Sequence, residues 1–330
     1  MSGSITGFLR SQVLLRLPEP TGSYAGKTII VTGSNVGLGK EAARHFARLG
    51  ASTVILAVRS LDKGNAAKAD IENSLGVSNI IKVWKLDMAS YRSVLDFATK
   101  VENQLSRVDV ALLNAGVARG KYEIFEDHEA TITVNVVSTF LLALSLLPKL
   151  EASAEQFQIR PNLTIVASGV HFFAKFEERK APEGGIFERL KQELNPSEME
   201  ERYQVSKLLD ILCTRALCER KPTSQTPVTI NCVCPGLCKS QLSREAGWGI
   251  VIQQALFARS TEYGSRTLVH AASQGPETHG KFMADCRVSD PSPFVLSDEG
   301  YAVQNRVWAE LSVILERIRP RILENLGISR

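Results

Sequence analysis

A tyrosine and a lysine stand four positions apart, at Tyr203 and Lys207, in the stretch RYQVSKLL. On a helix this spacing puts both side chains on one face, one turn apart. We expect a helix because Asn195 suits the N-cap, Pro196 suits the first helical position, and neither Gly nor Pro follows until Pro222. A phenol, with a pKa of about 10, needs a nearby cation to act as a base at neutral pH. An exposed surface pair is the alternative, because this spacing is common.

A glycine-rich turn follows the first β-branched run of the chain. In TGSNVGLGK, Gly33, Gly37 and Gly39 lie between KTIIVTG and a helical pattern. Such a turn lets the backbone approach a pyrophosphate, which then rests on the N-terminus of the helix. The spacing differs from the dinucleotide fingerprint G-x-G-x-x-G, so a plain glycine-rich turn is the alternative.

An arginine occupies the corner where a ribose-binding carboxylate would be expected. Twenty residues past Gly39, the second strand ends in LAVRS, with Val58 and Arg59 at this corner. An arginine can pair with a 2′-phosphate, which a carboxylate would repel. A solvated loop arginine is the alternative, but the glycine-rich turn favours phosphate binding.

Strand and helix patterns alternate from about residue 27, and they must position these side chains. We expect strands within residues 27–33, 52–58, 80–87, 108–116, 162–168 and 228–236. Nearly continuous apolar strands that alternate with helices predict a parallel sheet covered on both faces. The predicted fold class is therefore α/β, a doubly wound parallel sheet of the Rossmann type in a single domain with a C-terminal helical extension.

The domain has expected extensions and one insert. We expect an N-terminal extension over residues 1–24, the sheet domain over 25–280 and a C-terminal helical extension over 281–330. Residues 169–196 form an insert between a strand and a helix, and 239–262 form a second long segment. Segments of this length in a compact domain are usually functional.

Composition narrows the possible classes of protein. With 330 residues, 44% hydrophobic and 22% charged, the chain is typical of globular proteins, and a net charge of +4 gives no case for nucleic-acid binding. The six cysteines match no usual zinc spacing, so we expect no metal site. Cys232 and Cys234 alternate along a strand as small apolar residues. Reduced thiols and the lack of an apolar run of about 18 residues predict a cytoplasmic protein without a membrane span.

Seven landmarks then occur in a familiar order. They are TGxxxGxG, Asp87 in KLDM, NAG at 114–116, Asn135, Ser168, Tyr203-x3-Lys207 and PG at 235–236. Over roughly residues 25–275 the chain resembles the classical short-chain dehydrogenase/reductase family. Within it, TGSNVGLGKEAARHFARLGA and RYQVSKLL resemble the retinol-dehydrogenase-like branch, and especially fungal enzymes of secondary metabolism.

The resemblance implies catalytic roles for four residues. Tyr203 would be the general acid/base, and Lys207 would supply the nearby cation and bind the cofactor ribose. Ser168 would hydrogen-bond the substrate oxygen, and Ala167 before it leaves no second hydroxyl candidate. Asn135 resembles the asparagine whose backbone holds a water in a proton relay, and a capped or kinked helix is the alternative for it.

The resemblance also implies a set of cofactor-binding residues, and Arg59 with no acid at position 58 makes NADP the expected cofactor. Asp87 would contact the adenine and Asn114 would line the cleft. The family pattern PGxVxT departs here to PGLCKS, with Cys238 and Ser240 at the Val and Thr positions, which affects side-chain detail only. The full set of expected cofactor-binding residues is Gly33, Ser34, Asn35, Gly37, Leu38, Gly39, Arg59, Lys63, Asp87, Asn114, Gly116, Tyr203, Lys207, Pro235, Gly236, Cys238 and Ser240.

An NADP-dependent alcohol dehydrogenase or ketoreductase acting on a small molecule is therefore the leading hypothesis. A catalytically silent nucleotide-sensing protein would be expected to lack the Ser, Tyr or Lys, all of which are present. An epimerase or dehydratase of the extended type would favour G-x-x-G-x-x-G and a longer C-terminal substrate domain. Homodimers are frequent in the family, although the C-terminal extension could cover an interface.

The two long segments predict the class of substrate. Their apolar residues are Phe172, Phe173, Phe176, Ile186 and Phe187 in the insert, and Leu242, Trp248, Ile250, Val251, Leu256 and Phe257 in the second segment. An apolar wall at the carboxyl edge of the sheet fits a bulky lipophilic carbonyl compound such as a polyketide, terpenoid or retinoid. The alternative is that these side chains pack the segments onto the domain.

Overall fold

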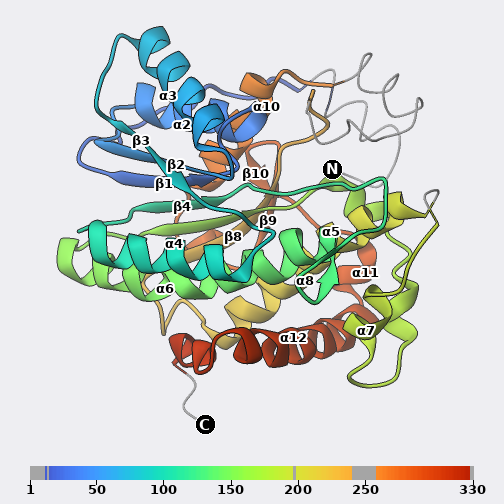
Figure 1. Ribbon diagram of the computed structural model, residues 1–330. Helices are drawn as coiled ribbons and strands as arrows, with labels where there is room; N and C mark the ends of the chain where they lie inside the picture. Colours follow the sequence, from blue (N-terminus) through green and yellow to red (C-terminus); the bar gives the residue numbers. More distant parts are fainter. Residues whose placement is uncertain (1–11, 13–14, 196–197, 240–257, 328–330) are drawn as a thin grey trace.

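The computed structural model describes residues 12, 15–195, 198–239 and 258–327. Its main sheet has eight strands in the order β10-β9-β8-β7-β4-β1-β2-β3 (Figure 1). The strands are β1 (Thr28–Thr32), β2 (Thr53–Val58), β3 (Ile81–Lys85), β4 (Val110–Leu113), β7 (Asn162–Val166), β8 (Thr229–Cys234), β9 (Phe282–Ala284) and β10 (Arg287–Val288). Neighbouring strands run parallel except β9 and β10, which are antiparallel. The predicted fold class is confirmed.

The six strands expected from the apolar runs are confirmed, and two further short strands of the main sheet were not predicted. β9 pairs with β8 and carries β10 at its edge, so the sheet continues past residue 280. β1 lies between β2 and β4, and the chain order reverses there. In open α/β sheets, ligands bind beyond the carboxyl ends of the strands at such a reversal. A ligand is therefore expected beyond the carboxyl ends of β1 and β4.

Helices cover both faces of the sheet. One face carries α2 (Gly37–Arg48), α3 (Leu61–Leu75) and α10 (Thr261–Ala271), and the other carries α4 (Tyr91–Gln104), α6 (Ser138–Phe157) and α8 (Met199–Arg220) (Figure 1). Successive side chains of β1 alternate between the two cores: Ile30 joins the α6 and α8 side, and Ile29 joins the α2 side. α12 (Asp298–Ile318), the expected C-terminal helix, packs against the outer side of α8.

Shorter elements complete the chain. They are β5 (Ile124–Phe125), β6 (His128–Glu129), α5 (Ala130–Ile132), the π-helical turn η2 (Thr133–Val137), η3 (Gly169–Phe173), η4 (Glu177–Lys180), α7 (Ile186–Leu190), η6 (Pro276–Thr278), α11 (Pro293–Leu296) and η7 (Ile322–Leu326). Of these, η3, η4 and α7 belong to the insert, so this insert has secondary structure of its own.

The helical run from Ala130 to Phe157 is long and apolar enough to cross a membrane by composition alone. Its most apolar window is, however, 94% buried inside the domain. α6 packs against α4 and the sheet, and its Phe140 contacts Trp308 of α12 edge-on. The run is therefore the central helix of the core.

The start of α8 differs from the prediction. The helix begins at Met199 with Glu198 as its N-cap, rather than at Pro196, which lies outside the described residues. Asn195 still contributes, because its carbonyl accepts a hydrogen bond from the Glu198 amide and its own amide donates to the Glu198 carboxylate. Asn195 thus belongs to a turn that precedes the helix.

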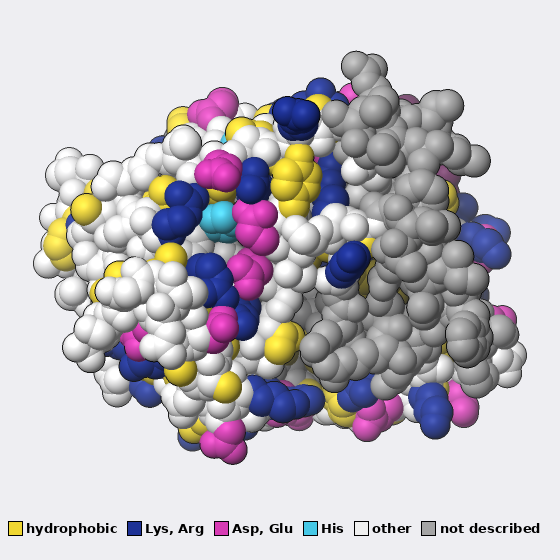
Figure 2. Space-filling model, turned by 90° about the horizontal axis from the view of Figure 1, so that it is seen from above, with side chains coloured by type: hydrophobic (Ala, Val, Ile, Leu, Met, Phe, Trp, Pro, Cys, Tyr) yellow, Lys and Arg dark blue, Asp and Glu magenta, His cyan; other side chains and the backbone are white. Residues whose placement is uncertain are grey.

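Charges of both signs are interspersed over the α2, α3 and α10 face. Figure 2 shows lysine, arginine and acidic side chains side by side on the part of this face that is not grey. Asp70 forms ion pairs with Lys40 and Arg44, and Arg266 pairs with Glu262. This mixture of charges is unlike the single-sign basic patch that nucleic-acid binding requires.

Candidate active site

Tyr203 and Lys207 lie on one face of α8, at the carboxyl edge of the sheet. The Lys207 ammonium is 6.0 Å from the centre of the Tyr203 ring. Its Nζ donates a 2.9 Å hydrogen bond to the carbonyl oxygen of Val166, the last residue of β7. The helix thus places the phenol and the cation above the end of a central strand.

Ser168 follows β7 and faces the same point. Its hydroxyl accepts a hydrogen bond from the Val170 amide of η3, and its side chain is near enough to Tyr203 to lower the pKa of the phenol. The Ser168 carbonyl lies 2.7 Å from Nδ1 of His171, a buried side chain. The three groups expected to carry the chemistry, at 168, 203 and 207, therefore come together.

The electrostatic surroundings act on Tyr203 in opposite directions. Burial raises the pKa of the Tyr203 phenol, while Lys207 and the Ser168 side chain lower it, and the net direction is upward. Burial lowers the pKa of Lys207, but Asp210 and Tyr203 together raise it by more, so the net direction is upward. The Lys207 side chain therefore stays a cation. In this structure the phenol is therefore held in its protonated form.

Asp210 is a member of the site that sequence reasoning missed. Its Oδ2 lies 2.9 Å from Lys207 Nζ, and the Asp210 side chain is only 1% exposed. Burial raises the pKa of Asp210 to about 6, although Lys207 lowers it. The signal was the i,i+3 spacing from Lys207, which places an acid on the same helix face as the cation.

Asn135 occupies the π-helical turn η2. Its side-chain oxygen accepts a hydrogen bond from the Val117 amide, and its Nδ2 donates to the Val117 carbonyl and to the Ser206 hydroxyl. Ser206 also donates to the Tyr203 carbonyl. The Asn135 side chain thus joins the segment after β4 to α8, and the irregular turn agrees with the kinked helix considered from the sequence.

The glycine-rich loop is packed too closely for side chains. A Cβ on Gly33, whose φ is 64°, would stand 2.9 Å from Cα of Ala115, and one on Gly39 would stand 2.5 Å from Nδ2 of Asn114. Asn114 donates from Nδ2 to the Thr32 carbonyl. The loop after β1 and the segment after β4 therefore form one rigid floor at the strand reversal.

The first turn of α2 is open to an anion. Its N-cap, Val36, makes no side-chain capping hydrogen bond, and the first turn contains no acid. Asn35, Gly37 and Leu38 are half-buried around it, whereas Ser34 is buried and donates to the Val31 carbonyl. Unpaired amides and the positive end of the helix dipole suit a phosphate group.

Cationic side chains gather beyond β2 and β3. Arg59 follows β2, Lys63 lies in the first turn of α3 together with the acid Asp62, and Lys85 ends β3. Lys85 Nζ donates a 2.6 Å hydrogen bond to the Arg59 carbonyl, which brings these residues to one corner. Lys85 was not among the residues predicted from the sequence, since strand ends with lysine are common.

Asp87 and Gly116 occupy their expected places on the same edge. Asp87 follows β3, and its Oδ1 accepts a hydrogen bond from the Ala89 amide. Gly116 follows β4, where an added Cβ would stand 3.2 Å from Oδ1 of Asn135 and 3.7 Å from Lys207 Nζ. A side chain at position 116 would therefore crowd Asn135 and contact the Lys207 ammonium.

The loop after β8 is anchored by a buried ion pair. Arg259 Nη2 lies 2.8 Å from Asp285, and Nη1 donates to the Pro235 carbonyl. Gly236 has a φ of 83°, and a Cβ there would stand 2.6 Å from Arg259 Nη1. Cys238 is buried beside Arg259, and burial raises the pKa of its thiol to about 12. Ser240 lies outside the described residues.

The apolar residues of the insert do not all face the site. Phe176, Ile186 and Phe187 are buried in the main core, so for them the packing alternative is correct. Phe172 stacks near His171, and Phe173 is 67% exposed. The apolar residues expected in the second segment, Leu242, Trp248, Ile250, Val251, Leu256 and Phe257, lie outside the described residues.

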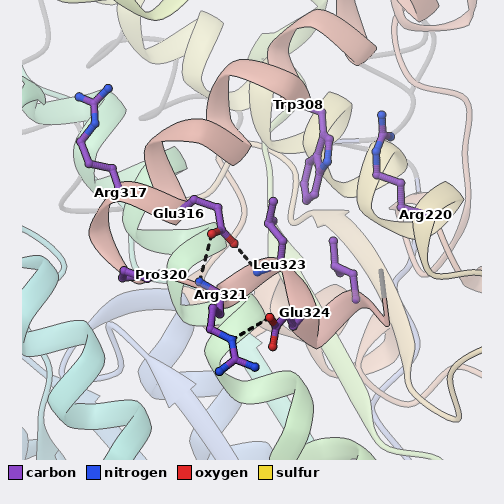
Figure 3. Close-up of a pocket in the computed structure, with 9 residues that line it drawn as sticks. Arg220, Trp308, Glu316, Arg317, Pro320, Arg321, Leu323 and Glu324 are labelled. Atoms are coloured by element: carbon purple, nitrogen blue, oxygen red, sulfur yellow. Dashed lines mark hydrogen bonds and ion pairs between the residues drawn. The ribbon is translucent and has the colours of Figure 1, made fainter. Parts of the chain in front are cut away.

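A hollow of about 690 Å³, whose lining is drawn in Figure 3, lies far from Tyr203, Lys207 and Ser168. It is lined by Arg220, Trp308, Glu316, Arg317, Pro320, Arg321, Leu323, Glu324 and Leu326. Arg220 and Tyr203 are at opposite ends of α8, about 25 Å apart at a rise of about 1.5 Å per residue. Glu316 accepts the Arg321 and Leu323 amides, and Arg321 pairs with Glu324. These contacts close the end of α12.

The described residues include no group of three or more His, Cys, Asp or Glu side chains that could hold a metal ion. The six cysteines are all free thiols. Cys232 and Cys234 are buried in β8 as apolar residues, as the alternation of the strand predicted.

Comparison with known proteins gives consistent results. A family model described as short chain dehydrogenase matches residues 27–159. The short chain dehydrogenase/reductase dmxR8 of Cryptosporiopsis sp. is 52% identical over 97% of this chain and 99% of its own length. The short-chain dehydrogenase anuD of Penicillium roqueforti is 41% identical over 97% of this chain and 86% of its own length.

Solved structures show the same fold at lower identity. An uncharacterized protein from Mycobacterium paratuberculosis has a TM-score of 0.67 and 24% identity, over 91% of this chain and 96% of its own. A short chain dehydrogenase from Shigella flexneri, solved as a complex with NADP, has a TM-score of 0.58 and 20% identity, over 80% of this chain and 98% of its own. At this identity the likeness concerns the fold.

Proposed function

Because this chain belongs to the short-chain dehydrogenase/reductase family of oxidoreductases, we propose that it transfers a hydride between NADP(H) and a carbonyl or secondary alcohol group. The observation that carries the proposal is the meeting of Tyr203, Lys207 and Ser168 above the end of β7. A phenol, a cation and a hydroxyl in this arrangement can transfer a proton to or from an oxygen held between them.

The residues present fit a dinucleotide. The floor made by Gly33, Gly39 and Asn114 leaves the backbone uncovered, and the open first turn of α2 can hold the pyrophosphate. Asp87 would contact the adenine, and Pro235 and Gly236 would border the nicotinamide. When bound, the nicotinamide supplies or accepts the hydride.

We propose NADP rather than NAD because of the charge beyond β2. Arg59, Lys63 and Lys85 are exposed cations at the corner where the adenosine ribose would end. A 2′-phosphate there would pair with Arg59, whose planar guanidinium suits phosphate geometry. Val58 provides no carboxylate to bind a free ribose hydroxyl.

The proposed proton transfer uses four side chains or backbone groups. Tyr203 donates its phenolic proton to the carbonyl oxygen during reduction and accepts it during oxidation. Ser168 hydrogen-bonds the same oxygen. Lys207 stabilises the phenolate and has a further N–H available for a ribose hydroxyl. Asn135 contributes its backbone carbonyl, because its side chain is fully used by Val117 and Ser206.

We propose that the substrate is a bulky lipophilic carbonyl compound or alcohol. Within the described part of the insert, the support comes from Phe172 and Phe173, because Phe176, Ile186 and Phe187 are committed to the core. The similarity to dehydrogenases of fungi supports a place in secondary-metabolite biosynthesis. Six free cysteines support a cytoplasmic location.

The test is a panel of bulky and small ketones and alcohols assayed with NADPH, NADH, NADP+ and NAD+. We expect reduction of bulky lipophilic ketones with NADPH. Preference for the small ketones would remove the lipophilic part of the proposal, and a lack of turnover with every cofactor would contradict the enzymatic function.

A further inference from the structure

The Lys207 ammonium is held by two fixed partners. An ammonium has three N–H donors. One N–H of Lys207 points to the Val166 carbonyl and a second to Asp210 Oδ2, both at 2.9 Å. Gly116 lies on the remaining side without a side chain, and a Cβ added there would come into van der Waals contact with Nζ at 3.7 Å. The two contacts therefore leave the third N–H for a further partner.

We infer that Asp210 is a positioning residue that fixes Lys207 and offsets its charge, so that Tyr203 stays protonated at neutral pH and the site favours carbonyl reduction. This inference rests on the proposed function and deepens it. The geometry supports it: Asp210 is 1% exposed, lies one helical turn beyond Lys207 and makes its ion pair away from solvent.

Lys207 is the charged partner of Asp210 in the described structure. The titratable groups that interact with Asp210 are Lys207, Tyr203 and the Cys213 thiol on α8 and the Cys232 thiol on β8. The Cys234 thiol on β8 interacts with Tyr203 and Lys207. Burial raises the pKa of all three thiols, so they are neutral at physiological pH. Asp210 itself is ionised above about pH 6.

The charges of Lys207 and Asp210 act in opposite directions on the pKa of Tyr203. Lys207 lowers the pKa of Tyr203, and Asp210 raises it. Removing the Asp210 charge leaves the field of the ammonium unopposed, which favours the tyrosinate. Asp210 Oδ2 lies 2.9 Å from Lys207 Nζ, which lies 6.0 Å from the centre of the Tyr203 ring, so the carboxylate acts on the phenol by opposing the ammonium charge.

The protonated phenol is the form that reduction consumes. When bound, NADPH would supply a hydride to the carbonyl carbon and become NADP+, while the carbonyl oxygen would take the Tyr203 proton as the C=O π bond breaks. The product would be an alcohol, and the tyrosinate would regain a proton from solvent. Oxidation of the alcohol needs the tyrosinate first. A phenol with a raised pKa is therefore ready for reduction over a wider pH range.

The experiment compares the pH dependence of kcat/KM for ketone reduction with NADPH in the wild type and three variants. Asp210→Asn removes the charge and keeps the shape, and Asp210→Glu keeps the charge. Asp109→Asn is the matched control, because Asp109 is also buried and ion-paired, with Arg107, at the other end of the sheet. We expect the fall in rate at high pH to move down by about one unit in Asp210→Asn alone.

The inference would be overturned if the midpoint of the fall in kcat/KM at high pH were the same in Asp210→Asn as in the wild type. It would also be overturned if Asp109→Asn shifted this midpoint equally. If Asp210→Asn does not fold, a second test is available. The tyrosinate absorbance of Tyr203→Phe is subtracted from that of the wild type, and the difference reports the ionisation of Tyr203. We expect no ionised Tyr203 at pH 8, and an ionised Tyr203 at that pH refutes the inference. The proposed function fails separately, if Tyr203→Phe keeps full activity.

Discussion

Arg306 of α12 donates a 2.6 Å hydrogen bond to the carbonyl oxygen of Ala181, which lies in the insert between Ser168 and Tyr203. The same guanidinium also donates to the carbonyls of two other insert residues. On the next turn of α12, Glu310 accepts the first two backbone amides of α7. The C-terminal helix therefore holds the insert in place between Ser168 and Tyr203, the proposed catalytic residues that flank it in the chain.

Replacing Arg306 by Ala should loosen the insert without altering the cofactor floor. The three carbonyls lose a charged donor, so we expect a loss of about 1 to 3 kcal/mol in the free energy of unfolding. The KM for a bulky ketone should rise severalfold, while the Kd for NADPH stays unchanged. Limited proteolysis should cut the insert faster. Arg321→Ala is the control, because Arg321 is exposed and pairs with Glu324 at the other end of α12. Equal effects of the two variants would contradict this view.

Tyr203→Phe should nearly abolish turnover and leave NADPH binding intact. Only the phenolic proton is removed, and general acid catalysis contributes about 10² to 10⁴-fold in rate. Lys207→Ala should impair both turnover and NADPH affinity, because the ammonium serves both. Steady-state kinetics and cofactor fluorescence measure the two effects. Tyr301→Phe, at an exposed phenol on α12, should behave as the wild type. Substantial turnover by Tyr203→Phe rules out the assigned acid.

Arg59→Ala should weaken the binding of NADPH and leave the binding of NADH unchanged. A charge-assisted phosphate contact is worth about 1.5 to 3 kcal/mol, so the KM for NADPH should rise about 10-fold or more. The comparison is kcat/KM for both cofactors in the wild type and the variant. Arg92→Ala, at an exposed arginine of α4, is the control. If the wild type uses both cofactors with equal efficiency, the assignment of Arg59 is wrong.

His171 should make the fold sensitive to acid. Its Nε2 accepts a hydrogen bond from the Ser292 amide, so the ring must be neutral, and burial lowers its pKa to about 4. The unfolded chain binds this proton at about pH 6.5. The contribution of the neutral His171 ring to the free energy of unfolding is therefore fully present above about pH 6.5 and is lost as the pH falls to about 4. This loss is at most about 3 kcal/mol.

Urea unfolding of the wild type and His171→Gln at pH 7.5, 5.5 and 4.5 measures this contribution. We expect the variant to be less stable at pH 7.5 but to lose less stability on acidification. His270→Gln serves as the control, because His270 is only half-buried. The same pH dependence in His171→Gln and the wild type would show that His171 does not titrate in this range.

The strands could be predicted because their signal is local. Apolar β-branched runs such as KTIIVTG and NLTIVAS need only their own residues to be recognised, and the structure places them at β1 and β7. The clustering of Tyr203, Lys207 and Ser168 was expected from the resemblance to the short-chain dehydrogenase/reductase family, and the structure brings the three side chains together. β9 and β10 were missed because three and two residues carry too little periodicity.

The insert could not be predicted in the same way. Its Phe176, Ile186 and Phe187 looked like a ligand wall, but they are buried in the core. Contacts with α12, more than 120 positions away along the chain, fix that orientation. Asp210 was overlooked for a related reason, since a single acid on a charged helix gives no sign of burial until β8 is packed against it.

The position of α12 also affects how the protein is made. α12 follows in the chain every other element that it contacts except the short turn η7, so during synthesis it is one of the last of them to leave the ribosome. Until then, apolar side chains such as Phe140 on α6 lack their partner Trp308, and the insert lacks Arg306. The nascent sheet domain therefore exposes apolar surface that invites chaperone binding or aggregation. A premature stop before α12 would yield a chain that holds every catalytic residue and still fails to accumulate in the cell.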